Sequence, residues 1–164
     1  MTIRELQATT SPHPFGLVTS LKEDGRTNLM ALSWWTFVSN TPPLLAIAVS
    51  NRGYTGTCIR RTGEFGLCLV GEGLKDRALR CGACSGRDRD KAAELSIELE
   101  DAAAIGAKLV KESCAALECR LTDALAAGDH TIYVAQIVEA RAKPEIGGRL
   151  YAWEGYRRLD PLRP

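Results

Sequence analysis

The chain has 164 residues, of which 45% are hydrophobic and 25% are charged, and its formal net charge is +1. This length predicts a single domain over residues 1–164 with a core that needs neither disulfides nor a structural metal. The near-neutral charge disfavours nucleic acid or an anionic membrane as the main partner. The first residues do not resemble a signal peptide, and no run of about eighteen apolar residues occurs, so we expect a cytoplasmic protein.

The first predicted element is a β-hairpin. Residues 15–21 have the composition of a strand, residues 22–26 contain an Asp-Gly turn, and residues 28–33 are predicted as the returning strand. Residues 34–38, with both tryptophans of this region, show no regular alternation, and the double proline at 42–43 excludes the interior of a central strand or helix. We therefore predict a structured loop that carries large aromatic side chains.

A buried strand and a short helix are predicted next. The apolar run Leu44 to Val49 indicates a strand buried on both faces. Residues 55–61 predict a helix with Thr55 as N-cap and Gly63 as the residue that ends it. Because the first amides of a helix lack partners and Arg52 lies just upstream, this helix start is a candidate phosphate site.

The remaining elements favour an antiparallel barrel over a doubly wound sheet, because strands and helices do not alternate regularly. Six or seven strands are predicted in all, with short helices between the third and the fifth. The further strands are predicted at residues 64–70, 114–121 and 131–140, with a final strand and turn at residues 150–157, and the short helices are predicted at residues 74–79 and 88–95.

Six cysteines are expected to be reduced and mostly buried. Cys81 and Cys84 have the C-x-x-C spacing of redox and zinc sites, but they follow a predicted helix instead of opening one. Cys114 and Cys119 do not have the spacing of a second zinc-binding pair. A surface loop is therefore favoured over redox or metal chemistry for the C-x-x-C pair, and no metal site is predicted.

Residues 28–34 could form the wall of a ring-binding site beside the candidate phosphate site. A flavin has a flat, largely apolar ring with a polar edge, and this segment supplies apolar walls and small polar groups. For Trp34 and Trp35 the alternative is a hydrophobic core or a dimer interface. His130 lies in a predicted turn, where a structural and a functional role are both open, and His13 is expected to be a packing residue.

Several segments, in the same order along the chain, resemble one family. They are Asn28 to Trp34, Pro42-Pro43, Asn51 to Thr55, Ser85 to Lys91, Gly128 to Thr131, and Leu150 to Arg157. Together they resemble the flavin reductase-like family, the FMN-binding split barrels that include flavoredoxin. The resemblance implies a mainly β fold with short helices, a six-stranded antiparallel Greek-key split β-barrel, and a homodimer with FMN at or near the subunit interface.

The resemblance also implies roles for individual residues. The ring and ribityl chain would be lined by Asn28, Met30, Ala31, Leu32, Ser33 and Trp34. The phosphate would be held by Ser50, Arg52, Tyr54 and Thr55, with Asn51 in the same cofactor-binding segment, and covered by Ser85, Arg87 and Lys91. The catalytic residue would be His130, near the place where a nicotinamide could stack. Ala135, Gln136 and Ala92 depart from the family pattern, and the first two put the nicotinamide side in question.

The function implied is that of an NAD(P)H:flavin oxidoreductase that supplies reduced flavin or electrons to an acceptor, such as a redox protein or a monooxygenase. Because the flavin performs the hydride chemistry, no metal, general base or nucleophile is required. An alternative is a flavoredoxin-type electron carrier with tightly bound FMN and no intrinsic NAD(P)H oxidation. A second alternative is a barrel that binds flavin or haem without redox turnover.

Overall fold

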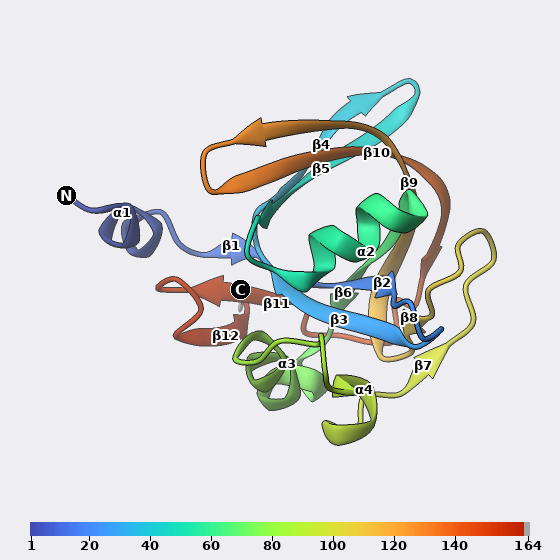
Figure 1. Cartoon of the computed structure of the whole chain (residues 1–164). Helices are drawn as coiled ribbons and strands as arrows, with labels where there is room; N and C mark the ends of the chain where they lie inside the picture. The colour runs from blue at the N-terminus through green and yellow to red at the C-terminus, as the bar shows by residue number, and fades with distance from the viewer. Residues whose placement is uncertain (163–164) are drawn as a thin grey trace.

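The structure is a computed structural model that describes residues 1–162 (Figure 1). The helices are α1 (Ile3–Thr9), α2 (Tyr54–Thr62), α3 (Lys75–Gly82) and α4 (Lys91–Glu94), with a 3₁₀ turn η1 (Glu72–Leu74). The strands are β1 (His13–Pro14), β2 (Gly16–Leu21), β3 (Thr27–Leu32), β4 (Trp35–Asn40), β5 (Pro43–Ser50), β6 (Glu64–Val70), β7 (Leu99–Glu100), β8 (Leu109–Val110), β9 (Ser113–Ala127), β10 (His130–Ala142), β11 (Leu150–Trp153) and β12 (Arg158–Pro161).

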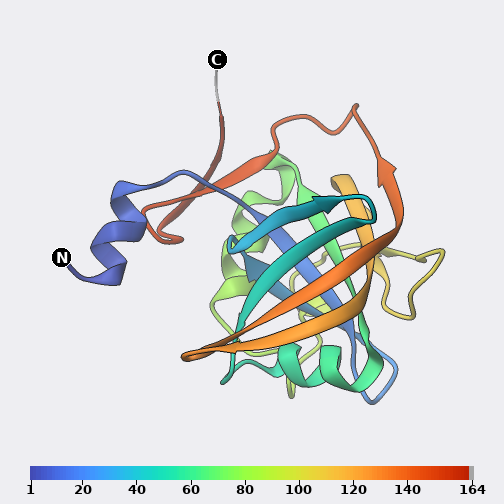
Figure 2. The same cartoon turned by 90° about the horizontal axis from the view of Figure 1, so that it is seen from above.

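Seven antiparallel strands form the main sheet, in the order β3-β2-β6-β9-β10-β5-β4. The sheet curves strongly, so that the β4–β5 and β9–β10 hairpins cross over the first strands (Figure 2), and α2 packs against β2, β3, β5 and β6. A second sheet, β1-β11-β12, lies beside the barrel. The predicted antiparallel barrel with short helices is confirmed, although the main sheet has seven strands where six were expected.

Strand β4 occupies residues that were predicted to form a loop. It pairs with β5 from Trp35 opposite Ile47 to Asn40 opposite Pro43, with a register shift between Phe37 and Ser39. The prediction was wrong because β4 is an edge strand, where a bulge and irregular alternation of side chains are tolerated. The first proline lies in the turn before β5 and the second begins it, so neither interrupts a central strand.

The β9–β10 hairpin is longer than predicted at both strands. Residues 122–127 extend β9 alongside the start of β10, which pairs with β5 from His130 onward, and a turn with Gly128 at φ 63° joins β9 and β10. Side chains in this extension of β9 are exposed. The hydrophobic pattern of β9 therefore ends before the strand itself ends, because backbone hydrogen bonds to β10 continue the pairing without apolar side chains.

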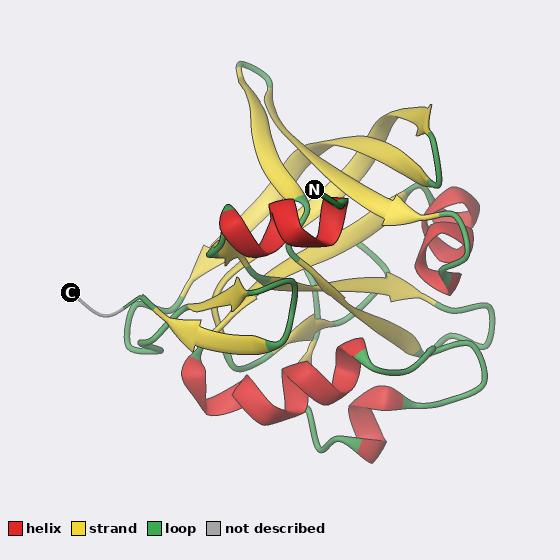
Figure 3. Ribbon diagram, turned by 90° about the vertical axis from the view of Figure 1, so that its left-hand side faces the viewer, coloured by secondary structure: helices red, strands yellow, loops and turns green. Residues whose placement is uncertain are grey.

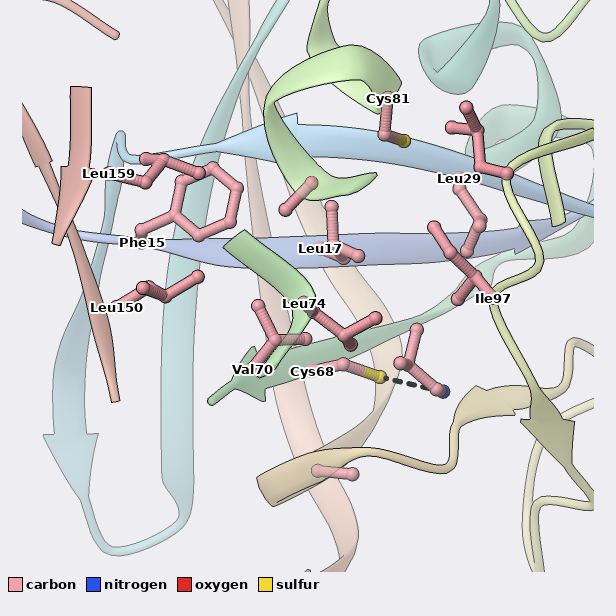
Figure 4. Packing of buried hydrophobic residues seen from close by; sticks show 14 of the residues in the cluster. Phe15, Leu17, Leu29, Cys68, Val70, Leu74, Cys81, Ile97, Leu150 and Leu159 are labelled. Atoms are coloured by element: carbon pink, nitrogen blue, oxygen red, sulfur yellow. Dashed lines mark hydrogen bonds between the residues drawn. The ribbon is translucent and has the colours of Figure 1, made fainter. Parts of the chain in front are cut away.

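Buried side chains form two clusters, one on each side of the β2–β6 layer. The first lies between this layer, α3 and the C-terminal strands, and includes Leu17, Leu29, Leu74 and Cys81 (Figure 4). The second fills the barrel beneath α2. Figure 3 shows α3 below the sheets and α1 in front of them, and α1 has no buried residue. In the part of the chain that the structure describes, no helix has the length and apolar character needed to cross a membrane.

Candidate functional site

A cavity of about 530 Å³ lies between β3, α3, the ends of β5 and β10, and the β11–β12 hairpin. Its walls are largely apolar, and none of the residues that line it is an aspartate, glutamate, lysine or arginine. The lining residues are Gln7, Phe15, Met30, Ala31, Leu32, Trp34, Ala48, Val49, Ser50, Ala78, Leu79, Gly82, Ala83, His130, Tyr156 and Leu159. A concave, mainly apolar site of this size is typical of small-molecule binding.

The N-terminal end of α2 lies beside this cavity and has no side-chain cap. The N-cap is Gly53, and Tyr54 is the first helical residue. Thr55 was predicted as the N-cap, and that prediction was wrong: its buried hydroxyl instead accepts a hydrogen bond from Asn28 Nδ2 at 2.9 Å. Gly63 ends the helix in the left-handed conformation, as predicted. The first amides of α2 are therefore free to bind an anion.

Contacts with β10 fix the position of α2 in the barrel. The hydroxyl of Tyr133, a buried residue, accepts a hydrogen bond from Arg60 Nη1 at 2.6 Å and donates one to the carbonyl of Gly56 at 3.4 Å. A Cβ added at Gly56 would lie 3.0 Å from that hydroxyl. Close approach of the helix to the strand therefore requires a small residue at Gly56.

The segment Ser85 to Arg87 covers the side of the α2 start. Gly86 lies so close to the Asn28 amide that an added Cβ would collide with it. The guanidinium carbon of Arg87 lies 4.8 Å from the centre of the Tyr54 ring, a cation–π contact, and its backbone N–H donates to Ser85 Oγ at 3.2 Å. Arg87 thus brings Tyr54 and Ser85 together beside the start of α2.

Lys91 is positioned differently from the expectation. Its buried ammonium donates to the carbonyl oxygens of Cys81 and Cys84, each at 2.8 Å, at the end of α3. These carbonyls have no partner within the helix, so a lysine there stabilises the helix end. Lys91 therefore holds the segment that carries Arg87, and two of its three N–H donors are occupied.

The turn that carries His130 is tied to the turn before α2. The backbone N–H of Asn51 donates to the backbone carbonyl of Asp129. The side chain of Asn51 donates through Nδ2 to the carbonyl of Gly128 and accepts through Oδ1 from Thr131 Oγ1. His130 Nδ1 lies 2.6 Å from Asp129 Oδ1, and this hydrogen bond keeps the pKa of the Asp129 carboxyl below its usual range. With Nδ1–H donating to the carboxylate, Nε2 remains available as an acceptor when the ring is neutral.

Trp34 and His130 form one wall of the cavity together. Their ring centres are 4.8 Å apart, with the planes inclined by 39°. Trp35 instead packs against the barrel core and against Phe37, with ring centres 5.6 Å apart. Of the two tryptophans, one thus lines the cavity and the other packs in the core, which were the alternatives that the sequence left open.

The structure brings most of the predicted site residues into two adjoining groups. The cavity wall contains Met30, Ala31, Leu32, Trp34, Ser50 and His130, and the α2 end contains Asn28, Arg52, Tyr54, Thr55, Ser85 and Arg87. Ser33, Asn51 and Lys91 lie behind these groups: Ser33 is buried, and Asn51 and Lys91 are bonded to the backbone. Sequence reasoning missed the cavity walls from α1, Phe15, α3 and the C-terminal hairpin, because no local pattern assigns these residues to a site.

The two cysteines of the C-x-x-C pair are not joined by a disulfide and differ in burial. Cys81 is buried at the end of α3, so the predicted surface loop was wrong for this residue. Burial raises the pKa of the Cys81 thiol to about 11, which disfavours the reactive thiolate at neutral pH. Residues 1–162 contain no group of three or more histidine, cysteine or acidic side chains that could hold a metal ion.

The chain belongs to the flavin reductase-like family. Residues 8–160 match the family model described as "Flavin reductase like domain". This result confirms the resemblance seen in the sequence.

Individual relatives agree with this classification. The chain is 29% identical over 153 residues to a flavin reductase of Pseudomonas putida, covering 92% of this chain and 86% of the relative. It is 30% identical over 139 residues to a flavin reductase (NADH) of Kitasatospora aureofaciens, covering 84% and 70%. It spans only 55% and 63% of the lengths of two archaeal relatives, from Aeropyrum pernix and Archaeoglobus fulgidus, to which it is 31% and 32% identical.

Solved structures show the same fold. Flavoredoxin of Desulfovibrio vulgaris superposes with a TM-score of 0.86 at 22% identity, covering 94% of this chain and 89% of that one. A flavoredoxin from Methanosarcina acetivorans gives a TM-score of 0.84 at 24% identity, covering 93% and 86%. The split-barrel architecture is thus shared with these proteins.

Proposed function

We propose that the chain binds FMN in the cavity and acts as an NAD(P)H:flavin oxidoreductase. One observation carries the proposal: Ser50 lines an uncharged cavity and its carbonyl accepts from Gly53, the N-cap of a helix start that has no side-chain cap and lies beside Arg52 and Arg87. A flavin ring fits the uncharged part, and a phosphate fits the amides and guanidinium groups at the helix start. The names of the Pseudomonas and Kitasatospora relatives support the same activity.

The residues present fit FMN in both parts of the site. Met30, Ala31, Leu32 and Trp34 would hold the ring through apolar contacts, and the amides of the first turn of α2 would hold the phosphate together with the side chain of Arg52. Gly86 provides the close backbone approach that closes the site beside Asn28. When bound, FMN would supply the hydride and electron chemistry that amino-acid side chains lack.

The protein's own contribution would be orientation and exclusion of water. The Trp34–His130 pair would present a flat wall to a nicotinamide, and Asp129 would fix the orientation of the imidazole through Nδ1. Lys91 and Asn51 would act indirectly, by holding the segments that carry Arg87 and His130. His130 is thus the proposed catalytic residue, and the nicotinamide donor, NADH or NADPH, is part of the proposal.

The partners are proposed in the same way. We propose a homodimer, because the edge strand β4 exposes Phe37 and Val38, with 59% and 49% of their surfaces accessible. An acceptor protein is proposed because one relative, 29% identical over 125 residues, is the reductase component of a 4-nitrophenol monooxygenase from Rhodococcus opacus. The location in the cytoplasm stays a prediction.

The experiment is to purify the protein, record its absorption spectrum and follow oxidation of NADH and NADPH with and without added FMN. We expect the protein to keep a flavin spectrum after incubation with FMN and removal of unbound FMN by gel filtration. We also expect FMN-dependent oxidation of NADH, NADPH or both. Riboflavin-free buffer and heat-denatured protein serve as controls. Protein that retains FMN but is reduced by neither nucleotide would contradict the reductase and favour the flavoredoxin-type carrier. Protein that binds no flavin would contradict both.

A further inference from the structure

The turn between β11 and β12 holds its residues in an unusual backbone conformation. Glu154, Gly155 and Tyr156 have φ values of 53°, 64° and 70°, so three successive residues are left-handed. A residue with a Cβ adopts this conformation only at a cost in free energy, and a bulky aromatic residue rarely does so. Strain of this kind persists where surrounding contacts hold it, often at a binding site.

In this turn the conformation places the Tyr156 ring in the cavity wall. The ring stands edge-on to Phe15, with centres 6.1 Å apart and planes at 76°. Of the Tyr156 surface, 37% remains exposed, so the residue borders the cavity and also faces solvent. The Phe15 ring is its fixed aromatic partner.

Strand β3 relates Tyr156 to the phosphate end of the site. Asn28, near the start of β3, is bonded to Thr55 in the first turn of α2. At the other end of β3, Leu32 pairs with Gly16, the residue after Phe15, whose ring packs against Tyr156. Four residues of extended chain separate Asn28 from Leu32, about 14 Å at about 3.4 Å per residue. Met30, Ala31 and Leu32 form the cavity wall between them.

We propose that Tyr156 is a further flavin-binding residue, whose ring closes the end of the cavity opposite the phosphate and packs against the flavin ring. The inference rests on the proposed function. It places an aromatic contact at the ring end of the site, on a hairpin remote in sequence from the other flavin-binding residues. A contact to the flavin ring alone contributes the same binding free energy to every ligand that contains the ring, whether or not the ligand carries a phosphate.

The test measures the binding of FMN, riboflavin and lumiflavin by quenching of flavin fluorescence. Tyr156→Asn and Tyr156→Gly both remove the ring while keeping a residue suited to the left-handed conformation, so at least one folded variant is expected. Tyr156→Phe keeps the ring. The matched control is Tyr151→Asn, which removes a tyrosine that pairs with Arg149 in the same hairpin and does not line the cavity. The melting temperature of each variant verifies folding.

We expect Tyr156→Asn and Tyr156→Gly to raise the Kd of all three ligands by the same factor, about 10-fold, because an aromatic contact and its buried area are lost. Tyr156→Phe and Tyr151→Asn should change each Kd by less than about 3-fold. Unchanged affinities in the folded Asn or Gly variant would overturn the inference while leaving the proposed function intact. A loss confined to FMN would also overturn it. Wild-type protein that binds none of the ligands would overturn the proposed function as well.

Discussion

Arg52 is the residue whose proposed role can be separated most cleanly from the rest of the site. It is exposed immediately before α2, and its backbone N–H donates to Ser50 Oγ at 3.4 Å. Its guanidinium would contact the phosphate of FMN and not the ring. We therefore expect Arg52→Ala to weaken FMN binding by roughly 10- to 100-fold, since a charge-assisted hydrogen bond is lost, and to change riboflavin affinity by less than about 2-fold.

Fluorescence titration with both ligands checks this prediction. Arg61→Ala is the matched control, because Arg61 lies in the last turn of the same helix and donates to the carbonyl of Leu21. It removes the same charge at the opposite end of α2. Equal losses for FMN and riboflavin in the Arg52 variant would rule out a phosphate contact.

Among individual residues, the sequence predicted those cavity residues that lie close to one another along the chain. Met30 and Trp34 could be assigned to one wall because they lie in one short segment with a recognisable composition. Tyr156 could not be assigned, since it reaches the cavity only through the pairing of β11 with β1 and through a left-handed turn. Neither long-range pairing nor φ at a tyrosine can be read from the local pattern.

Among the elements, the loop after β7 depends on one buried carboxylate of β9. Glu118 accepts hydrogen bonds from the backbone N–H groups of Ala103 and Ala104 and from Arg141 Nη2. Burial alone would raise the pKa of Glu118, but these hydrogen bonds outweigh it and keep the pKa below its usual range. A lowered folded-state pKa means that the ionised group stabilises the fold above the unfolded-state pKa and loses this effect as the pH falls.

We expect Glu118→Gln to lower the free energy of unfolding by about 1–3 kcal/mol at pH 7, because the charge-assisted hydrogen bonds are lost. The difference from the wild type should shrink as the pH falls from about 4.3, the usual pKa of a glutamate, through the lower folded-state value. Urea unfolding at several pH values measures it. Glu23→Gln, in the exposed β2–β3 turn, is the control. A difference in unfolding free energy between Glu118→Gln and the wild type that stays constant down to pH 3 would contradict the proposed role of the Glu118 carboxylate.

The elements themselves were predicted where local pattern and packing agree. The predicted bounds of β2, β5 and β6 are close to the observed ones, and the barrel buries the apolar runs of β2 and β6. The predicted burial of β5 on both faces was wrong, because its residues alternate between buried and half-buried. Strand β4 and the extension of β9 were missed, because exposed edges and protruding hairpins do not need an apolar pattern. The N-cap of α2 was misplaced by two residues, at Thr55 instead of Gly53, since the Thr55 hydroxyl bonds Asn28 and not the helix backbone.

For the whole molecule, the exposed edge of the sheet leads to a prediction about assembly. We expect the wild type to be a dimer by light scattering, because Phe37 and Val38 on β4 would be covered by a second copy. Replacing both by glutamate should give a monomer, since two charges would have to be buried. Ile3→Glu, on α1 with 66% of its surface exposed, is the control and should remain a dimer. A wild-type monomer with full FMN occupancy would contradict the proposal.

The order of strands also has a consequence for how the site forms during synthesis. The cavity wall takes residues from Gln7 to Leu159, and β2 and β5 have partners, β6 and β10, that follow much later in the chain. Such non-local pairing slows folding, because long loops must close before the contacts form. Flavin bound at the proposed site would therefore stabilise only a chain that has left the ribosome almost completely and has folded as one unit, and it would give no support to a nascent N-terminal half.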